Sequence, residues 1–80
     1  MTDNEIRTLA ADVLGGIAPE ADLAGVGDDE DLREALDLDS MDFLNFVIAL
    51  GERTGRKIPD ADTPRLFTVR GLLDYFGNPG

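Results

Sequence analysis

The residues best placed to do chemistry are one serine and three nearby aspartates. Ser40 directly follows Asp39, and Asp37 and Asp42 lie close on either side, just before and within the apolar run 41–50. Serine and aspartate favour helix N-termini because their side-chain oxygens accept hydrogen bonds from unpaired backbone N–H groups. The pattern therefore places Ser40 in or just before the first turn of a helix. A phosphate ester there would lie near the positive end of the helix dipole, although a serine that only caps the helix fits the same tripeptide.

Nothing else in the chain is suited to activate this serine as a nucleophile. A serine nucleophile needs a general base that a third group holds in place. The sequence contains no histidine and no cysteine, and its single lysine, Lys57, follows the far end of the expected helix. Asp39 is too weak a base for an unperturbed hydroxyl. We therefore expect no catalytic residues and no enzyme activity, and Ser40 can instead be the substrate of an enzyme that supplies the base.

The aspartates around Ser40 lack the spacing of a calcium-binding loop. An EF-hand loop that began at Asp37 would place Met41 at an Asp/Asn position, Asp42 at the glycine and Ile48 at the bidentate glutamate. We therefore expect no metal site.

The first part of the chain predicts a helix followed by a long loop. Thr2 and Glu5 have the spacing of a capping box, and apolar residues then repeat at helical intervals over residues 3–14. The glycine pair 15–16 is expected to end this helix. Residues 18–31 read as a loop, and one helical turn is expected directly after it.

The second helix, expected at residues 40–54, carries two apolar stripes. The stripe expected to face the core is Phe43, Phe46, Val47 and Leu50. The second stripe, with the polar residues beside it, is Met41, Leu44, Ile48, Asp42, Asn45 and Glu52. Burial of both stripes is difficult in an 80-residue domain, so we expect an exposed apolar strip edged by acids; the pattern leaves open whether Leu44 is buried at the core margin.

The last part of the chain predicts one short and one longer helix. The short helix is expected around residues 62–66, with Asp60 or Asp62 as its cap and Pro64 in its first turn. Thr68 is expected to cap the last helix, which should end and fray over residues 77–80. With no strand pattern, the sequence predicts an all-α fold: a small four-helix bundle of three main helices and one short helix.

Composition narrows the possible partners and locations. The chain has 17 acids and 7 bases, and its formal net charge is -10. Such a surface repels nucleic acids and anionic lipids, and it attracts proteins with basic patches. The polar N-terminus does not resemble a signal peptide, and no apolar stretch is long enough to span a bilayer. We therefore expect a cytoplasmic monomer without nucleic-acid binding or membrane insertion, forming one domain over residues 1–80 with an ordered core at about 3–76.

Several motifs, taken in order, resemble those of acyl carrier proteins. The family pattern is Asp-Ser-Leu, an apolar and acidic helix, an Ile-Pro turn, and a Thr-Val pair that opens the last helix. The matching segments here are residues 38–44, 47–50, 57–60, 68–69 and 73–76. The resemblance is close over residues 30–76 and extends to the whole chain in length and layout.

The resemblance implies a cofactor and a set of partners. It implies that a phosphopantetheinyl transferase attaches 4'-phosphopantetheine covalently to Ser40, between Asp39 and Met41, and that the cofactor thiol carries an acyl group. The absence of cysteine agrees, because the reactive sulfur would arrive with the cofactor. The implied partners are this transferase and acyl-loading, synthase or acyltransferase enzymes with basic patches. The residues expected to contact them are Asp37, Met41, Asp42, Leu44, Asn45, Ile48 and Glu52.

The cargo is less constrained than the attachment site. Residues 28–42 hold eight acids and one base, and we expect these acids to surround the root of the cofactor. Asp37 replaces the frequent glycine of the family and Met41 replaces leucine, which favours a specialised fatty acid, lipid or polyketide pathway. An aminoacyl or peptidyl carrier, such as a D-alanyl carrier, and an unmodified acidic helical adaptor both stay open. Bulky side chains expected in the interior would leave little room for a long acyl chain; these are Phe43, Phe46, Phe67, Phe76, Leu72 and Leu73.

Overall fold

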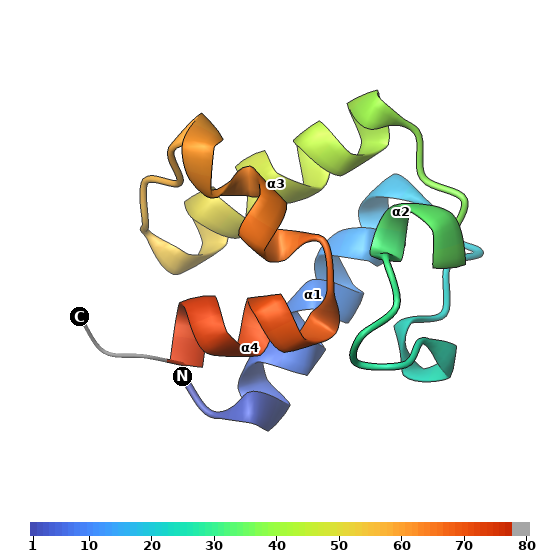
Figure 1. The fold of residues 1–80 in the computed structure, drawn as a ribbon, viewed down its shortest axis with the longest axis horizontal. Helices are drawn as coiled ribbons and strands as arrows, with labels where there is room; N and C mark the ends of the chain where they lie inside the picture. Colours follow the sequence, from blue (N-terminus) through green and yellow to red (C-terminus); the bar gives the residue numbers. More distant parts are fainter. Residues whose placement is uncertain (78–80) are drawn as a thin grey trace.

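Four helices of seven or more residues account for most of the chain in the computed structural model, which describes residues 1–77 (Figure 1). They are α1 (Asp3–Ile17), α3 (Ser40–Thr54), the 3₁₀ helix η2 (Asp60–Leu66) and α4 (Val69–Gly77). Two shorter turns, η1 (Leu23–Gly25) and α2 (Leu32–Ala35), lie in the connection between α1 and α3. Helix α1 packs against α3 and α4, and α4 packs against η2. The predicted all-α bundle is thus confirmed, with no strand anywhere in residues 1–77.

Helix α1 begins as predicted but is longer than predicted. Thr2 and Glu5 form the expected capping box. The glycine pair 15–16 does not end the helix, which continues to Ile17, so the predicted end at residue 14 was wrong. Two interior glycines cost about 1 kcal/mol each relative to alanine, and burial of the neighbouring Val13 and Leu14 offsets that cost. The helix ends where Pro19 approaches, since proline cannot continue it.

Helix α3 has the predicted bounds and the predicted buried face. Its first residue is Ser40, and Gly55 ends it in the left-handed conformation, with φ of 70°. The four residues of the expected core stripe are all buried. Together with side chains from α1, α2 and α4 they form one hydrophobic cluster, and no polar side chain is buried in the described part of the chain.

The short third helix differs from the prediction in its start and its cap. It is a 3₁₀ helix that begins at Asp60, and its N-cap, Pro59, makes no side-chain capping bond. Asp62, one of the two expected caps, instead accepts a hydrogen bond of 2.8 Å from the Tyr75 hydroxyl. This hydrogen bond is the main reason that the pKa of Tyr75 is raised, and it ties η2 to α4. Pro64 lies beyond the first turn, where a 3₁₀ helix avoids the clash with the i−4 carbonyl that an α-helix would impose.

Helix α4 begins against the backbone of η2. Thr68 caps it as predicted, with its Oγ1 accepting from the Gly71 N–H at 3.0 Å. A Cβ atom at position 71 would overlap the carbonyl oxygen of Arg65, so only glycine fits this contact. The buried side chains of α4 are Val69, Leu72 and Phe76, while Leu73 is half-buried. The expected fraying of residues 77–80 falls largely outside the described residues.

Candidate functional site

Ser40 is an exposed residue at the start of α3 and does not cap the helix. Asp39 is the N-cap instead, and its Oδ1 accepts from the Asp42 N–H at 2.8 Å. Within residues 1–77, no hydrogen bond engages the Ser40 side chain. The alternative that Ser40 serves only as a cap is therefore contradicted, because Asp39 already satisfies the backbone donor that a capping serine would take.

Asp37 makes the turn that leads into this helix. It is the one non-glycine residue with positive φ, 54°, in the described part of the chain. Aspartate tolerates this left-handed region better than most residues do, although glycine adopts it more readily. The Leu38 N–H donates to the Arg33 carbonyl at 2.8 Å, and the buried Leu38 side chain anchors the turn. This backbone geometry favours glycine, and an aspartate can also adopt it.

An apolar strip follows Ser40 along the outer face of α3. Met41 is 62% exposed, Leu44 45% and Ile48 49%. Leu44, whose position the sequence left open, is therefore on the surface. Asn45 and Glu52, the polar residues predicted beside the strip, are also exposed, and Asp42 is half-buried. All the residues predicted to bind partners thus lie on α3 or in the turn before it; their role in binding stays a prediction.

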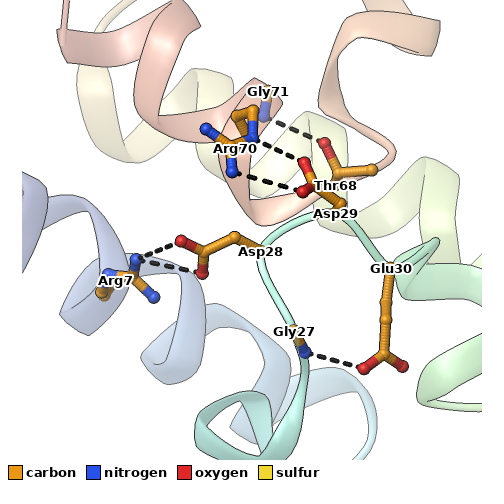
Figure 2. Close-up of polar contacts among 8 residues, drawn as sticks. All are labelled: Arg7, Gly27, Asp28, Asp29, Glu30, Thr68, Arg70 and Gly71. Carbon is orange, nitrogen blue, oxygen red and sulfur yellow. Dashed lines mark hydrogen bonds and ion pairs between the residues drawn. The ribbon is translucent and has the colours of Figure 1, made fainter.

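Three acids at the start of the run 28–42 form hydrogen bonds within the fold (Figure 2). Asp28 accepts two hydrogen bonds from Arg7 of α1, and Asp29 accepts two from Arg70 of α4. The Glu30 carboxylate accepts from the Gly27 N–H at 3.0 Å. The carboxylates of Asp28 and Asp29 thus bind the loop to the bundle, and that of Glu30 closes a turn within the loop. Asp37, Asp39 and Asp42 flank Ser40 in the chain, and that acids surround the root of the cofactor stays a prediction.

Arginine contacts also change the titration of this loop. The hydrogen bond from Arg70 lowers the pKa of Asp29, and the hydrogen bonds from Arg33 lower the pKa of Asp31. Two backbone bonds complete the attachment: Leu32 N–H to the Phe67 carbonyl at 2.8 Å, and Arg70 N–H to the Asp28 carbonyl at 2.9 Å. The loop before α2 is therefore a fixed element of the site's support.

Residues 4–76 match the protein family described as "Phosphopantetheine attachment site". The chain belongs to the acyl carrier protein family. It is 32% identical to the acyl carrier protein of Campylobacter hominis over 74 residues, which is 92% of this chain and 87% of that protein. It is 31% identical to that of Acidothermus cellulolyticus over 80 residues, covering 98% and 92% of the two chains. The acyl carrier protein of Lactobacillus johnsonii is 33% identical over 75 residues, covering 94% and 92%.

Membership of this family implies covalently attached 4'-phosphopantetheine. The N-terminus of α3 suits such a cofactor. The Ser40 hydroxyl is exposed and unengaged within the described chain, and it lies at the positive end of a 15-residue helix. Among residues 1–77, no group of three or more acids, histidines or cysteines could hold a metal ion. No helix in the same range is long and apolar enough to cross a membrane.

Two features of this acyl carrier protein were not found from its sequence. One is the set of ion pairs that hold the loop, since Arg70 and Asp29 are 41 residues apart. The other is a stack in which the Arg33 guanidinium lies 3.7 Å from the centre of the Phe67 ring, and that ring meets Phe43 edge-on at 5.2 Å. Only the single base in the acidic run, Arg33, hinted at a local neutralising contact.

Proposed function

We propose that Ser40 is the attachment site of 4'-phosphopantetheine, and that the chain carries acyl intermediates as thioesters in a specialised fatty acid, lipid or polyketide pathway. The observation that carries this proposal is that Asp39, and not Ser40, caps the helix. Asp39 caps α3, so the Ser40 hydroxyl is left exposed at the helix N-terminus. A residue whose only role was structural would not need to be placed there.

The chain's own contribution to attachment is presentation rather than catalysis. The Oγ of Ser40 would form the new bond to the phosphorus on the pantetheine side of coenzyme A. The diphosphate linkage would break, and adenosine 3',5'-bisphosphate would leave. The proton from Oγ would pass to a base on the transferase, because the sequence offers no histidine. The partially positive N-terminus of α3 would then stabilise the phosphodiester.

The exposed strip on α3 would be the surface that partner enzymes recognise. Met41, Leu44 and Ile48 offer an apolar strip, and Asp37 and Asp42 add charge at its Ser40 end. Apolar centres with charged rims are typical of transient protein interfaces. In this proposal, the partners are the phosphopantetheinyl transferase and acyl-handling enzymes with basic patches, and residues 1–80 act as one monomeric carrier domain.

One observation favours a second candidate, an aminoacyl or other short, polar cargo. Phe43, Phe46 and Phe76 are buried in the bundle interior, and Leu72 is buried beside them. Close-packed interiors resist added volume, and overpacking commonly costs about 1–3 kcal/mol. A short cargo that stays outside would avoid this cost. Loading the holo protein with acyl groups of increasing length separates the two: shifts in the amide signals of Phe46 and Leu72, with rising Tm, would identify an internal site for long chains.

The attachment site is tested by intact mass. Incubation of the chain with a phosphopantetheinyl transferase and coenzyme A should add the mass of one phosphopantetheine group. The Ser40→Ala variant should gain no mass while its circular dichroism spectrum and Tm stay close to those of the wild type. Labelling that persists in Ser40→Ala would refute the assignment, and a wild type that gains no mass would favour the unmodified adaptor.

A further inference from the structure

A surface groove lies between the end of α1, the loop after it, and α2. Its volume is about 690 Å³. Ala18, Ala21, Val26 and Leu36 line it, and each of these residues is only partly buried. The groove therefore presents apolar surface that neither the core nor another segment of the described chain covers. Its dimensions suit an inserted side chain or loop better than a single water molecule.

Every charged residue that lines this groove is an acid. These residues are Glu20, Asp22, Glu30 and Asp37. Asp22 and Glu30 are held by bonds to backbone N–H groups of the loop, 3.2 Å and 3.0 Å long, which fix their positions at the rim. In the described residues, Glu20 and Asp37 make no ion pair. A site with an apolar floor and a fixed acidic rim is complementary to a basic residue flanked by apolar ones, and it repels phosphate and carboxylate groups.

The groove lies at the same end of the molecule as Ser40. Asp37 lines the groove, and the turn that it starts leads through Asp39 to Ser40 at the beginning of α3. Figure 1 shows the end of α1, α2 and the start of α3 together on one side of the molecule. The exposed strip on α3 extends from Ser40 along the helix toward its C-terminus. A protein bound at Ser40 could thus contact the strip and the groove at once.

We propose that this groove receives an apolar segment bearing an arginine or lysine, presented by the phosphopantetheinyl transferase that modifies Ser40. The proposal rests on the function proposed above and adds a second contact surface to it. Its physical basis is charge complementarity together with the groove's connection to Ser40 through Asp37. The contact would orient the chain so that the Ser40 hydroxyl, rather than another part of the acidic surface, reaches the reactive centre.

The test compares two charge reversals that change net charge equally. Glu20→Lys reverses a rim acid of the groove, and Asp74→Lys reverses an exposed acid on α4, which does not line the groove. At low salt, Glu20→Lys should lower the kcat/KM of modification about three- to tenfold, and Asp74→Lys by less than about twofold. High salt should bring the kcat/KM values of the two variants closer together, because exposed charges are screened. Thermal unfolding would verify that both variants are folded.

A third variant, Ala21→Trp, fills the groove without changing charge and should also slow modification. Equal rates for Glu20→Lys and Asp74→Lys, in a wild type that is modified normally, would overturn the groove proposal and leave the Ser40 assignment intact. A slow Glu20→Lys with an unaffected Ala21→Trp would also overturn it, because the acid would then act through the long-range field alone. A wild type that gains no cofactor would overturn both proposals.

Discussion

Two acidic segments that are close in the chain differ in what their carboxylates do. In residues 28–31, Asp28 and Asp29 bind Arg7 of α1 and Arg70 of α4 and fix the loop to the bundle. Asp31 binds the nearby Arg33 within the α2 turn. In residues 37–42, no ion pair engages an acid within the described chain, and the acids flank the exposed Ser40 in the sequence. The difference teaches that acid density alone does not identify a binding surface. What matters is whether the fold brings an arginine within reach.

The comparison predicts that changes near the first segment affect stability, whereas changes near the second affect modification. The largest stability effect is expected for Gly71→Ala, at the start of the helix that carries Arg70. The new Cβ would overlap the Arg65 carbonyl, and the required shift should lower the free energy of unfolding by about 3 kcal/mol. Denaturant titration measures this loss. In the matched control, Gly15→Ala, the Cβ meets nothing within 4 Å, so the variant should be as stable as the wild type or more stable by up to about 1 kcal/mol.

Asp39→Ala tests the acid of the second segment whose carboxylate caps α3. Loss of its bond to the Asp42 N–H should cost about 1 kcal/mol, the usual value of an N-cap. Asp39→Asn keeps an acceptor and should recover most of this stability. Because Asn removes the charge, the modification rate of Asp39→Asn then reports the electrostatic role alone. Equal stability of the Ala and Asn variants would show that the capping bond contributes little.

Ile48→Ala should slow loading by partner enzymes several-fold while changing stability little. The side chain is 49% exposed, so its truncation should cost less than about 1 kcal/mol, well below a core substitution. Val47→Ala, on the buried face of the same helix, is the control and should lose more stability. Steady-state kinetics and thermal unfolding of both variants measure the two effects. A large stability loss in Ile48→Ala would show that Ile48 supports the core as Val47 does, and would contradict the assignment of its face of α3 to partner binding.

The smallest effect is the acid sensitivity of the loop. Asp29 and Asp31 have a lowered pKa in the folded chain, from an ordinary value of 3.8, so they bind protons less readily when folded than when unfolded. Their contribution to stability is full above that ordinary value and is lost as the pH falls through the lowered pKa. The Tm should therefore decline below about pH 4, and less steeply in Asp29→Asn. If the Tm of the wild type and of Asp29→Asn fell equally with pH, the Asp29–Arg70 pair would be excluded as a cause of the acid sensitivity.

Local features of this protein could be read directly from its sequence. The bounds of α3, its buried stripe, the capping box of α1 and the Thr68 cap were all predicted and confirmed. Each depends on residues within one or two helical turns, where spacing determines which side chains meet. The position of Ser40 at a helix start belongs to the same class of local information.

Only the tertiary structure decided which local preferences prevailed and which distant groups met. Helix α1 passes through two glycines because its flanking side chains are buried, and η2 is a 3₁₀ helix whose Asp62 bonds to Tyr75 of α4. The partners of Asp28 and Asp29 lie 21 and 41 residues away in the chain. Such contacts depend on how the helices pack, which no short spacing pattern encodes. The packing therefore distinguished the acids that hold the loop from the acids beside Ser40, which have no arginine partner in the described chain.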